Sequence, residues 1–370
     1  MHFSVIKEDI LKYLQYANSF TNPKGLNDIL QNIYMEAENN TVNIKATNYQ
    51  MGFSCNFEVH NIEREGRITV SCRKLLDIIK ELPDGALIDF QYDDTRLNVI
   101  CSKSKFKLST IPSENFPSMG EIIPEYYLKI NSSDLITLLK RTVFCILNDS
   151  QKLEYTGAQF IVNRDVLEIS ATGMQRVAIA SVKFDTEYSN DFTVNIPKKT
   201  VSEIIRVFEN KGLIEIETDR RQISFKADNI TVYSKLIEKF VKNIDRLFMD
   251  ERYPVKAKID RKSFIEASKR VSAITSEETP GIILEFDKSA LKMSSLETIY
   301  GEGSEIIDII DFNTENFEII LNARHVNEIL NTNESEEFTL DMRDKRSPVL
   351  ITPSDNNYRY LVVPISIDKI

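Results

Sequence analysis

One pattern of residues recurs three times along this chain, at a nearly constant spacing of about 125 residues. Each copy reads as an apolar strand that runs directly into an amphipathic helix. The three copies are ITVSCRKLLDIIKEL from Ile68, FTVNIPKKTVSEIIRVF from Phe192 and FEIILNARHVNEIL from Phe317. Aligned where the strand meets the helix, Arg73, Lys199 and Arg324 correspond, with separations of 126 and 125 residues. A repeat of this length constrains the fold more than any local motif, because every copy must build the same supersecondary unit.

Two other elements repeat in step with this one. An alternating strand that leads into a turn surrounds Thr47, Thr172 and Leu296, with separations of 125 and 124 residues. Each copy also opens with a short strand and an amphipathic helix, and these helices are EDILKYLQYANSF, SSDLITLLKRTVFCIL and DRKSFIEASKRVSAIT. Because much of the remainder alternates between apolar and polar residues, we expect an α+β fold whose antiparallel sheets are covered by two helices per domain. The three expected tandem domains are residues 1–122, 125–250 and 253–370.

The charge of the chain is unevenly divided. Its 370 residues carry a net formal charge of −10, which by itself argues against a nucleic-acid-binding protein. The six expected helices together carry +7, so the rest of the chain carries −17. This division lets one surface attract phosphates while the remainder repels DNA and keeps the protein in solution.

Charged residues also recur on the polar faces of the helices. They are Lys199, Glu203 and Arg206 in the second copy, Arg73, Asp77 and Lys80 in the first, and Arg324 with Glu328 in the third. A base placed before its acid is the weaker order for stabilising a helix, so helix stability does not explain the pattern. A solvated face is the alternative for any single helix, but the recurrence favours a common role.

In the helix expected at residues 197–208, the first turn also carries charges that helix stability does not explain. Its apolar residues recur from Val201 at the spacing of one helix face, and Pro197 suits the start of a helix. Lys198 and Lys199 follow at the positive end of the helix dipole, where cations are disfavoured. Nothing within the helix accounts for two lysines there.

An enzyme and a purely structural scaffold are the rival classes of function. The chain has three histidines at no metal-ligand spacing, and the G-x-G at 301–303 is too short a motif to predict a phosphate-binding loop. The carboxylate pairs at 93–94 and 277–278 are more typical of solvated turns than of acid–base catalysis. We therefore expect no catalytic site, no metal and no cofactor. A scaffold without a nucleic-acid partner would not need the repeated basic surface.

The cysteines and the apolar runs limit the location of the protein. Four cysteines lie far apart with no C-x-x-C spacing, which predicts reduced and buried thiols. The start of the chain lacks the pattern of a signal peptide, and no apolar run approaches the roughly 18 residues of a spanning helix. We expect a cytoplasmic protein with no membrane partner.

Five stretches, by their order and spacing, resemble the bacterial sliding clamp family, the β subunit of the replicative DNA polymerase III. They are GRITVSCRKLLDIIKELPDG at 66–85, FKLSTIPSENFP at 106–117, LEISATGMQRVAIA at 167–180, SKLIEKF at 234–240 and SPVLITPSDNNYRYLVVPI at 347–365. The likeness runs through essentially the whole chain. It implies a non-catalytic DNA clamp of three clamp domains per chain, with sheets outside and helices inside, that closes as a head-to-tail homodimeric ring around duplex DNA.

The resemblance also accounts for the basic helix faces. Lysines at a helix start would face phosphates across the central hole, where the negative charge of DNA offsets the dipole penalty. Such contacts hold DNA without reading its sequence, so the ring can slide. The residues at the family's DNA-contact positions are Lys24, Arg73, Lys198, Lys199 and Arg206. A loop with Asn148 and Asp149 contributes in relatives, but Asp149 would repel phosphate, so we do not include it.

Two further surfaces are implied by the resemblance. At the ring seam, Phe106 and Leu108 on an edge strand of the first domain would face Ala273 and Ile274 of the third domain of the other copy. A cleft between the second and third domains would bind a short extended peptide of partner proteins. The cleft positions are Tyr155, Thr172, Arg176, Val177, Leu247, Asn322, His325, Pro348, Val362, Val363, Pro364 and Ile365. An ordinary core strand is the alternative for Val362 and Val363.

The implied partners are the replicative polymerase subunit, an ATP-dependent clamp loader and other replication and repair proteins that carry a clamp-binding peptide. This chain departs from the family pattern at the cleft. The turn at 172–176 reads Thr-Gly-Met-Gln-Arg instead of Thr-Asp-Gly-His-Arg, FVKNI at 240–244 replaces a Phe-Pro-Asp-Tyr stretch, and a usual aromatic residue is His325. The chain also continues past the usual end as residues 366–370. We therefore expect an altered peptide preference on an unchanged fold.

Overall fold

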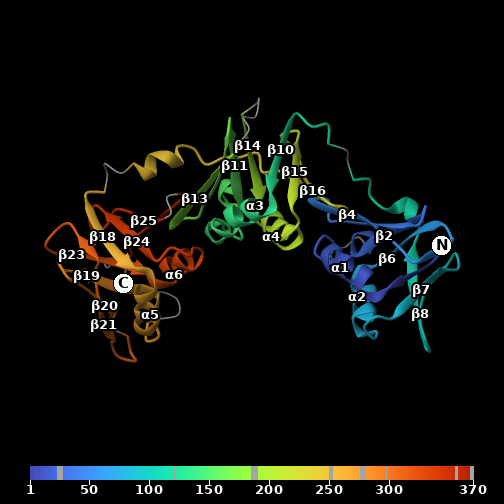
Figure 1. The fold of residues 1–370 in the computed structure, drawn as a ribbon, viewed down its shortest axis with the longest axis horizontal. Helices are drawn as coiled ribbons and strands as arrows, with labels where there is room; N and C mark the ends of the chain where they lie inside the picture. Colours follow the sequence, from blue (N-terminus) through green and yellow to red (C-terminus); the bar gives the residue numbers. More distant parts are fainter. Residues whose placement is uncertain are drawn as a thin grey trace. The chain divides into compact units, whose positions relative to one another are not determined.

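The structure is a computed structural model, and it describes residues 1–22, 28–119, 122–184, 191–249, 253–275, 281–296, 298–354 and 357–366. The chain, drawn as a ribbon in Figure 1, divides into two compact units. The first unit comprises residues 1–133 and 202–236, and the second comprises residues 134–201 and 237–370. Neighbouring strands pair antiparallel throughout the described residues of both units, as the sequence predicts.

The first unit contains one sheet of 13 strands among the described residues. From one edge to the other, its strands are β10 (Tyr126–Asn131), β15 (Leu213–Thr218), β16 (Gln222–Ala227), β17 (Ile230–Lys235), β4 (Met51–Glu58), β3 (Thr41–Thr47), β2 (Asn32–Glu38), β6 (Gly66–Ser71), β9 (Ser104–Ile111), β8 (Arg96–Cys101), β7 (Leu87–Tyr92), β1 (His2–Ile6) and β5 (Asn61–Arg64). The sheet therefore joins strands of the first sequence repeat to strands of the second.

The second unit contains two sheets among the described residues. The larger sheet consists of β14 (Phe192–Pro197), β11 (Gly157–Asn163), β12 (Val166–Thr172), β13 (Arg176–Lys183), β26 (Tyr358–Val362), β25 (Val349–Pro353), β24 (Glu337–Met342), β18 (Val255–Asp260) and β22 (Asp311–Phe312). The smaller sheet consists of β21 (Ser304–Asp308), β20 (Ala290–Ser295), β19 (Gly281–Phe286) and β23 (Phe317–Asn322). The larger sheet joins the second repeat to the third.

The helices of the described residues follow the repeat. The α-helices are α1 (Lys7–Asn18), α2 (Cys72–Glu81), α3 (Ser132–Lys140), α4 (Lys198–Phe208), α5 (Arg261–Ser272) and α6 (Ala323–Asn331). Short 3₁₀ helices are η1 (Asp28–Gln31), η2 (Ser113–Asn115), η3 (Val143–Cys145), η4 (Leu153–Thr156) and η5 (Ile244–Phe248). Arg73, Lys199 and Arg324 are each the second residue of their helix, which confirms the alignment of the three copies.

One expected helix start is displaced. Pro197 is the last residue of β14 and pairs with Gly157, so α4 begins one residue later than the sequence predicts. Proline can end the strand because its missing N–H removes no further bond from the ladder there. The two lysines consequently become the first two residues of α4.

The helices cover one face of the sheets and bury their apolar stripes there. In the first unit, α1 and α2 lie side by side against β2, β3, β4 and β6 (Figure 1). Leu14 of α1 and Leu75 of α2 are fully buried. In the second unit, α5 packs on β19, β20 and β21, and α6 on β23 and β26. Alternation along the strands places one row of side chains in each core, as in β3, where Val42, Ile44 and Ala46 are buried.

The cysteines are free and buried at all four positions, and burial raises the pKa of Cys72 and of Cys145 to about 12. The buried positions match the prediction from the sequence, and a raised pKa keeps these thiols unreactive. None of the helices described is long and apolar enough to cross a membrane. No group of three or more potential ligands for a metal ion occurs among the residues that the structure describes.

A buried lysine joins the two helices of the first unit. Lys7, the first residue of α1, has 6% of its surface exposed. Its Nζ donates hydrogen bonds to the carbonyl oxygens of Lys80 at 3.1 Å and Leu82 at 2.5 Å, and to the Asp84 carboxylate at 2.8 Å. These carbonyls end α2, where the helix dipole favours a cation. Lys7 therefore caps the C-terminus of α2 from the start of α1.

Replacement of Lys7 by Met should leave these carbonyls unpaired beneath the surface. We expect the free energy of opening of the α2 amides, measured by native-state hydrogen exchange, to fall by about 1–3 kcal/mol. Lys74→Met is the matched control, because Lys74 is exposed on the same helix and should change this free energy by less than about 0.5 kcal/mol. Equal effects of the two substitutions would contradict the assignment.

Candidate functional sites

The first candidate site is the set of cations expected to face DNA. Arg73 and Lys199 lie in the first turns of α2 and α4, and both are exposed. Within the described residues, neither side chain forms a hydrogen bond or an ion pair, and neither first turn contains an acidic residue. These two cations are therefore available to an external anion. Lys24 lies outside the described residues.

Lys198 has a different environment from its neighbour. Its side chain is half-buried, and Nζ donates a hydrogen bond to the carbonyl oxygen of Ile146 at 2.6 Å. Burial lowers the pKa of Lys198, as does the charge of Arg176, while Glu328 and Cys145 act in the opposite direction. The ammonium group is thus already held by the protein, next to residues expected at the peptide cleft.

Arg206 is held by the end of another helix. Its guanidinium pairs with Glu203 and donates to the carbonyl oxygens of Gln15 and Tyr16, each at 3.2 Å. It also donates to Ser19 Oγ at 2.9 Å and lies 5.3 Å from the centre of the Tyr16 ring. Arg206 therefore caps the C-terminus of α1, and only 38% of its side chain is exposed. A phosphate would have to compete with these partners.

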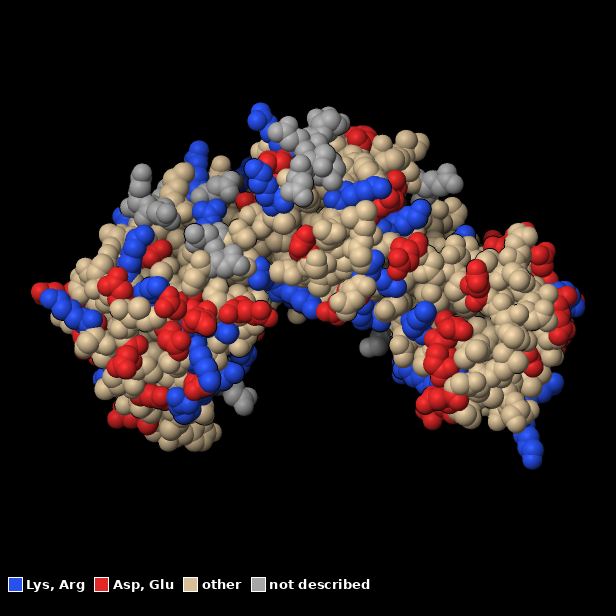
Figure 2. Space-filling model, in the orientation of Figure 1, with Lys and Arg blue, Asp and Glu red and all other residues tan. Residues whose placement is uncertain are grey.

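The charge on α1 and α2 is mixed. Figure 2 shows acidic and basic side chains interspersed over these two helices. The exposed charged residues there are Glu8, Asp9, Lys12, Arg73, Lys74, Asp77, Lys80 and Glu81. An interspersed surface of this kind attracts a polyanion only weakly.

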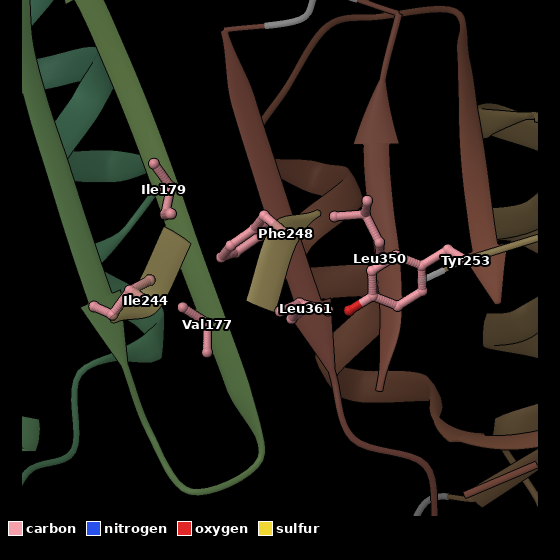
Figure 3. Packing of buried hydrophobic residues seen from close by; sticks show 7 residues of the cluster. All are labelled: Val177, Ile179, Ile244, Phe248, Tyr253, Leu350 and Leu361. Atoms are coloured by element: carbon pink, nitrogen blue, oxygen red, sulfur yellow. The ribbon is translucent and has the colours of Figure 1, made fainter. Parts of the chain in front are cut away.

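The second candidate site lies where β13 meets β26, and a buried apolar cluster supports it (Figure 3). The cluster consists of Val177 and Ile179 on β13, Ile244 and Phe248 on η5, Tyr253, Leu350 on β25 and Leu361 on β26. Ile244 points toward Val177, and Phe248 lies between the two sets of strands (Figure 3). The segment that leads from the second repeat to the third is thereby fixed on the sheet. A hydrogen bond also attaches this segment to the sheet, because the N–H of Val241 donates to Gln159 Oε1 at 2.7 Å.

Apolar side chains remain exposed around this cluster. Leu247, on the outer side of η5, is 39% exposed, and Val363, just beyond β26, is also 39% exposed. Met174 in the turn before β13 is 79% exposed. The short helix η5 therefore buries Ile244 and Phe248 and presents Leu247 to solvent. These exposed residues are available to an apolar ligand.

The expected cleft residues differ in their accessibility. Half-buried positions are Tyr155, Arg176, Asn322, His325, Pro348, Pro364 and Ile365. Exposed positions are Leu247 and Val363, and buried positions are Thr172, Val177 and Val362. Val362 is fully buried because β26 is an inner strand between β13 and β25. The core-strand alternative therefore describes Val362 itself, whereas its neighbour Val363 has left the sheet.

Two main-chain N–H groups just after β26 already form hydrogen bonds within the chain. The N–H of Val363 donates to the carbonyl oxygen of Gln175 at 2.8 Å, and the N–H of Ile365 donates to that of Ile320 at 2.9 Å. Residues 363–365 thus run from the end of β13 to β23. A peptide at this site would need other main-chain groups than these two N–H groups.

Arg176 forms the charged part of this site together with Glu328. Its guanidinium pairs with the Glu328 carboxylate, donates to the carbonyl oxygen of Phe144 and lies 5.4 Å from the centre of the Phe144 ring. The Arg176 side chain is 18% exposed, whereas that of Glu328 is 40% exposed. The pair joins β13 to α6. Its carboxylate leaves the Arg176 charge largely neutralised toward a ligand.

His325 stands beside this pair, in the first turn of α6. Burial lowers the pKa of His325 to about 4, and the neighbouring charges of Arg176 and Arg324 act in the same direction, against Glu328. Asn322 caps the helix, since its Oδ1 accepts the N–H of His325 at 3.2 Å. The imidazole is therefore neutral at neutral pH and serves as a polarisable, half-buried surface.

The expected seam residues lie on β9 and directly after α5. Residues 104–109 of β9 pair with β8, while pairing with β6 is confined to Thr110 and Ile111. Phe106 is 36% exposed and Leu108 is half-buried. Ala273 is exposed at the end of α5, and Ile274 is half-buried with its carbonyl oxygen accepting a hydrogen bond from Thr298 Oγ1 at 3.2 Å.

Comparison with known proteins identifies the family. Models of three domains of the DNA polymerase III beta subunit match in order: the N-terminal domain at residues 1–120, the central domain at 129–240 and the C-terminal domain at 249–366. The chain belongs to the DNA polymerase III beta subunit family. This is a family of non-catalytic processivity factors, and the three tandem domains are clamp domains, as the sequence resemblance predicts.

The relatives cover the chain from end to end. It is 26% identical over 367 residues to the beta sliding clamp of Pseudomonas putida, and the match covers 99% of this chain and 100% of the relative. It is 27% identical over 373 residues to that of Rickettsia bellii, with 97% of each chain covered. The structure of the DnaN sliding clamp of Pseudomonas aeruginosa superposes with a TM-score of 0.94 at 25% identity, covering 99% of this chain and 100% of that one.

A Helicobacter pylori beta clamp bound to a DNA ligase peptide has the same fold, with a TM-score of 0.90 at 24% identity, and the match covers 99% of this chain and 100% of that one. At this identity, the likeness establishes the clamp fold alone.

Sequence reasoning did not find the partner of Arg176. Glu328 reads in the sequence as part of a solvent-facing stripe with Arg324, but its carboxylate pairs with a residue 152 positions away. No local pattern signals a contact between β13 and α6. The position of Glu328 one helical turn after Arg324 is equally compatible with both arrangements.

The environment of His325 gives a pH prediction. We expect an NMR titration of its imidazole to give a pKa near 4. Because this pKa lies below the value near 6.5 of an unfolded histidine, its contribution to stability is unchanged above about pH 6.5 and is lost as the pH falls toward 4. Arg176→Met should raise the pKa of His325, since it removes a neighbouring positive charge.

Lys256→Gln is the control for this titration, because Lys256 is not among the groups that shift His325. A pKa of His325 above 6, or an equal effect of the two substitutions, would contradict the arrangement.

Proposed function

We propose that this chain is the processivity clamp of a replicative polymerase, and that two copies join head to tail into a ring that encircles duplex DNA. A head-to-tail contact that closes after two copies satisfies the symmetry of a ring. The match to three clamp domains over the full chain supports this proposal. Partner proteins, among them the polymerase and an ATP-dependent loader, would bind the ring without any reaction catalysed by the clamp.

One repeated strand pairing carries the proposal. β4, which follows the turn at Thr47, pairs with β17, the last strand of the second repeat. β13, which follows the turn at Thr172, pairs in the same sense with β26, the last strand of the third repeat. The equivalent strands that remain are β21 of the third repeat and β9, the last strand of the first. Among the described residues, β21 pairs only with β20, and residues 104–109 of β9 pair only with β8.

The two open edges suit one another chemically. β9 presents exposed Lys105 and Lys107, and β21 carries exposed Asp308 together with Glu305, whose carboxylate is paired with Arg270 within the chain. Each edge also exposes an apolar residue, Phe106 at 36% on β9 and Ile306 at 66% on β21. Opposite charges and apolar pairs across neighbouring strands are favourable, whereas an isolated exposed edge invites aggregation. Pairing β9 of one copy with β21 of another would repeat the pairing used twice within each chain.

The seam gives the experiment that tests the proposed ring. We expect light scattering of the wild-type protein at micromolar concentration to give twice the chain mass of 42.6 kDa. Phe106→Asp should place a carboxylate against an apolar surface, raise the dimer dissociation constant at least about 100-fold and yield the single-chain mass.

Ile123→Asp is the matched control for the seam, because Ile123 is 82% exposed outside either edge. Wild-type protein that is monomeric under these conditions, or a Phe106→Asp variant that stays dimeric, would refute the seam.

For DNA contact, Arg73 and Lys199 are the leading candidates because their charges are unpaired within the described residues. Lys198 and Arg206 are proposed as secondary contacts, since each is held by carbonyl oxygens of the protein. Lys24 completes the proposed set from the sequence. Contacts of this kind would position DNA within the ring without sequence readout.

The double variant Arg73→Glu, Lys199→Glu should weaken binding to duplex DNA while leaving the dimer intact. The slope of log affinity against log salt should become shallower by about 0.9 for each phosphate contact that is lost. Lys226→Glu is the control, because Lys226 is exposed on β16 and outside the proposed contacts. DNA affinity and salt slope equal to the wild type would exclude these residues as contacts.

For partner binding, we propose the site at β13, β26, η5 and the start of α6 as a peptide cleft. Its exposed apolar residues, Leu247 and Val363, surround the buried cluster, and half-buried Tyr155 and His325 add aromatic surface. A Helicobacter pylori relative is a clamp bound to a ligase peptide, so a peptide is the class of partner to test. Neutralisation of Arg176 by Glu328 favours an apolar peptide over an acidic one.

Deletion of the last eight residues, from Val363, should abolish binding of a clamp-binding peptide from the replicative polymerase of the same cell. The deletion also removes the two main-chain bonds of Val363 and Ile365. The second variant is therefore Val363→Asp, which keeps the chain intact and should weaken binding at least tenfold by burying a carboxylate. Ile123→Asp again serves as the control, and peptide affinity retained in both cleft variants, measured by fluorescence polarisation, would refute the cleft.

A further inference from the structure

The junction of β4 and β17 in the first unit repeats the junction of β13 and β26 in the second. Met51 on β4 pairs with Ser234, and Arg176 on β13, 125 residues later, pairs with Val362. One residue further on, the N–H of Lys235 donates to the carbonyl oxygen of Gln50 at 2.8 Å. In the second unit, the N–H of Val363 makes the equivalent bond to Gln175, also at 2.8 Å. The backbone that frames the proposed peptide cleft therefore exists twice in the chain.

The segments that cover the two junctions are equivalent as well. The ring of Phe116 lies 5.6 Å from that of Tyr34, and 125 residues later Val241 bonds to Gln159. Met119 covers Gly52, since a Cβ atom on Gly52 would lie 2.8 Å from the Met119 sulfur. Ile244 packs in the same way in the cluster that contains Val177. At the first junction Met119 thus fills the place that the side chain of Val177 takes at the second, and open space remains beside Met119.

This space forms a groove of two adjoining hollows, which share Ser118, Met119 and Tyr233. The smaller hollow, of about 170 Å³, lies at the end of β4 and β17 and includes Lys235. The larger, of about 500 Å³, lies over β2, β3 and β4 and includes Lys45. We call this the first-junction groove. Its volume falls in the range that holds a short peptide segment.

The charges of the first-junction groove are all positive. Lys45 and Lys235 contribute to its lining, and no described carboxylate does, although the chain as a whole carries a net charge of −10. Within the described residues, neither lysine forms an ion pair, and Lys45 Nζ lies 5.5 Å from the centre of the Tyr34 ring. This differs from the second junction, where Glu328 neutralises Arg176.

The groove also offers surfaces for main chain and rings. Three aromatic side chains line the larger hollow: Tyr34, Phe116 and Tyr233. Asn43 lines the same hollow, and its Oδ1 is buried with no hydrogen-bond partner among the described residues. A buried carbonyl oxygen without a donor is costly, and a peptide N–H would satisfy it.

We propose that the first-junction groove is a second docking site, which binds an extended acidic peptide with an aromatic residue, presented by a partner protein. The aspartate or glutamate side chains pair with Lys45 and Lys235, the aromatic ring packs against the outer side of the contacting pair Tyr34 and Phe116, and a main-chain N–H reaches Asn43. The comparison of the two junctions rests on the proposed peptide cleft, but the groove and its charges stand independently of it. The two junctions then select peptides of different charge.

The probe for this site is a fluorescein-labelled peptide, Glu-Asp-Phe-Glu-Asp, with Gln-Asn-Phe-Gln-Asn as its neutral counterpart, added to the full-length protein. We expect the acidic peptide to bind at least tenfold more tightly than the neutral one, in fluorescence polarisation at low salt. Lys45→Glu and Lys235→Glu should each weaken this binding at least tenfold. Lys226→Glu, the same change outside the groove, should leave it within twofold, and thermal melting should show that all variants remain folded.

Three results would overturn the proposal. They are absence of binding at 1 mM peptide, equal affinity for the two peptides, and equal effects of Lys226→Glu and the groove variants. The cleft variant Val363→Asp separates this proposal from the proposed function: loss of binding there but not in Lys45→Glu would place the acidic peptide at the second junction instead. If Lys45→Glu and Lys235→Glu weaken duplex DNA binding tenfold and leave the peptide unaffected, the groove is a nucleic-acid surface and the proposal fails.

Discussion

Strand pairing between successive repeats is the interaction on which the rest of this structure depends. β4 pairs with β17, and β13 pairs with β26, so main-chain hydrogen bonds join the first repeat to the second and the second to the third. Such pairing requires an edge strand at a fixed place in every copy, which explains why the turn before it recurs at Thr47 and Thr172. Among the described residues it leaves β21 of the third copy paired only with β20, and residues 104–109 of β9 in the first copy paired only with β8.

The same pairing frames both of the proposed binding sites. At each junction, a residue at the end of the last strand of one repeat donates its N–H to the residue just before the paired strand of the preceding repeat. Val363 donates to Gln175 in this way, and Lys235 donates to Gln50. A connecting segment is fixed over the strands, with Phe248 buried and Leu247 exposed at the second junction. The framework is set by main chain and is therefore constant. The side chains placed on it differ, with Arg176 paired with Glu328 at the second junction and Lys45 and Lys235 in the groove of the first, so the two proposed sites would accept peptides of different charge.

The sequence predicted the parts of this fold that depend on local periodicity. The helices that carry Arg73, Lys199 and Arg324 in their first turns, and the antiparallel sheets, follow from the spacing of apolar residues and from the repeat. The accessibility of single side chains did not follow, because it depends on contacts between distant segments. Arg206 lies on the polar face of α4, as expected, but it caps α1, more than 180 residues away.

The burial of Val362 on its strand likewise depends on contacts between distant segments. Alternation can tell which face a residue occupies, but only the sheet order shows that β26 has neighbours on both sides and that Val362 is fully buried. The same is true of the charge of Lys198: its position in the sequence indicates a surface lysine, whereas its ammonium is held by the carbonyl oxygen of Ile146. The cationic surface left for DNA is therefore smaller than the composition of the helices predicts. Few free cations are consistent with the proposed ring, which would hold DNA by enclosing it and not by affinity alone.

Retention on DNA of defined topology tests this central claim most directly. The wild-type protein, loaded on a nicked circular duplex by its clamp loader, should remain bound through gel filtration at a salt concentration that abolishes binding to short duplexes. It should be lost within minutes after a single cut linearises the circle, because a ring can then slide off the end. Retention that is equal on circular and linear DNA would contradict the account, since it would show that affinity and not enclosure holds the protein.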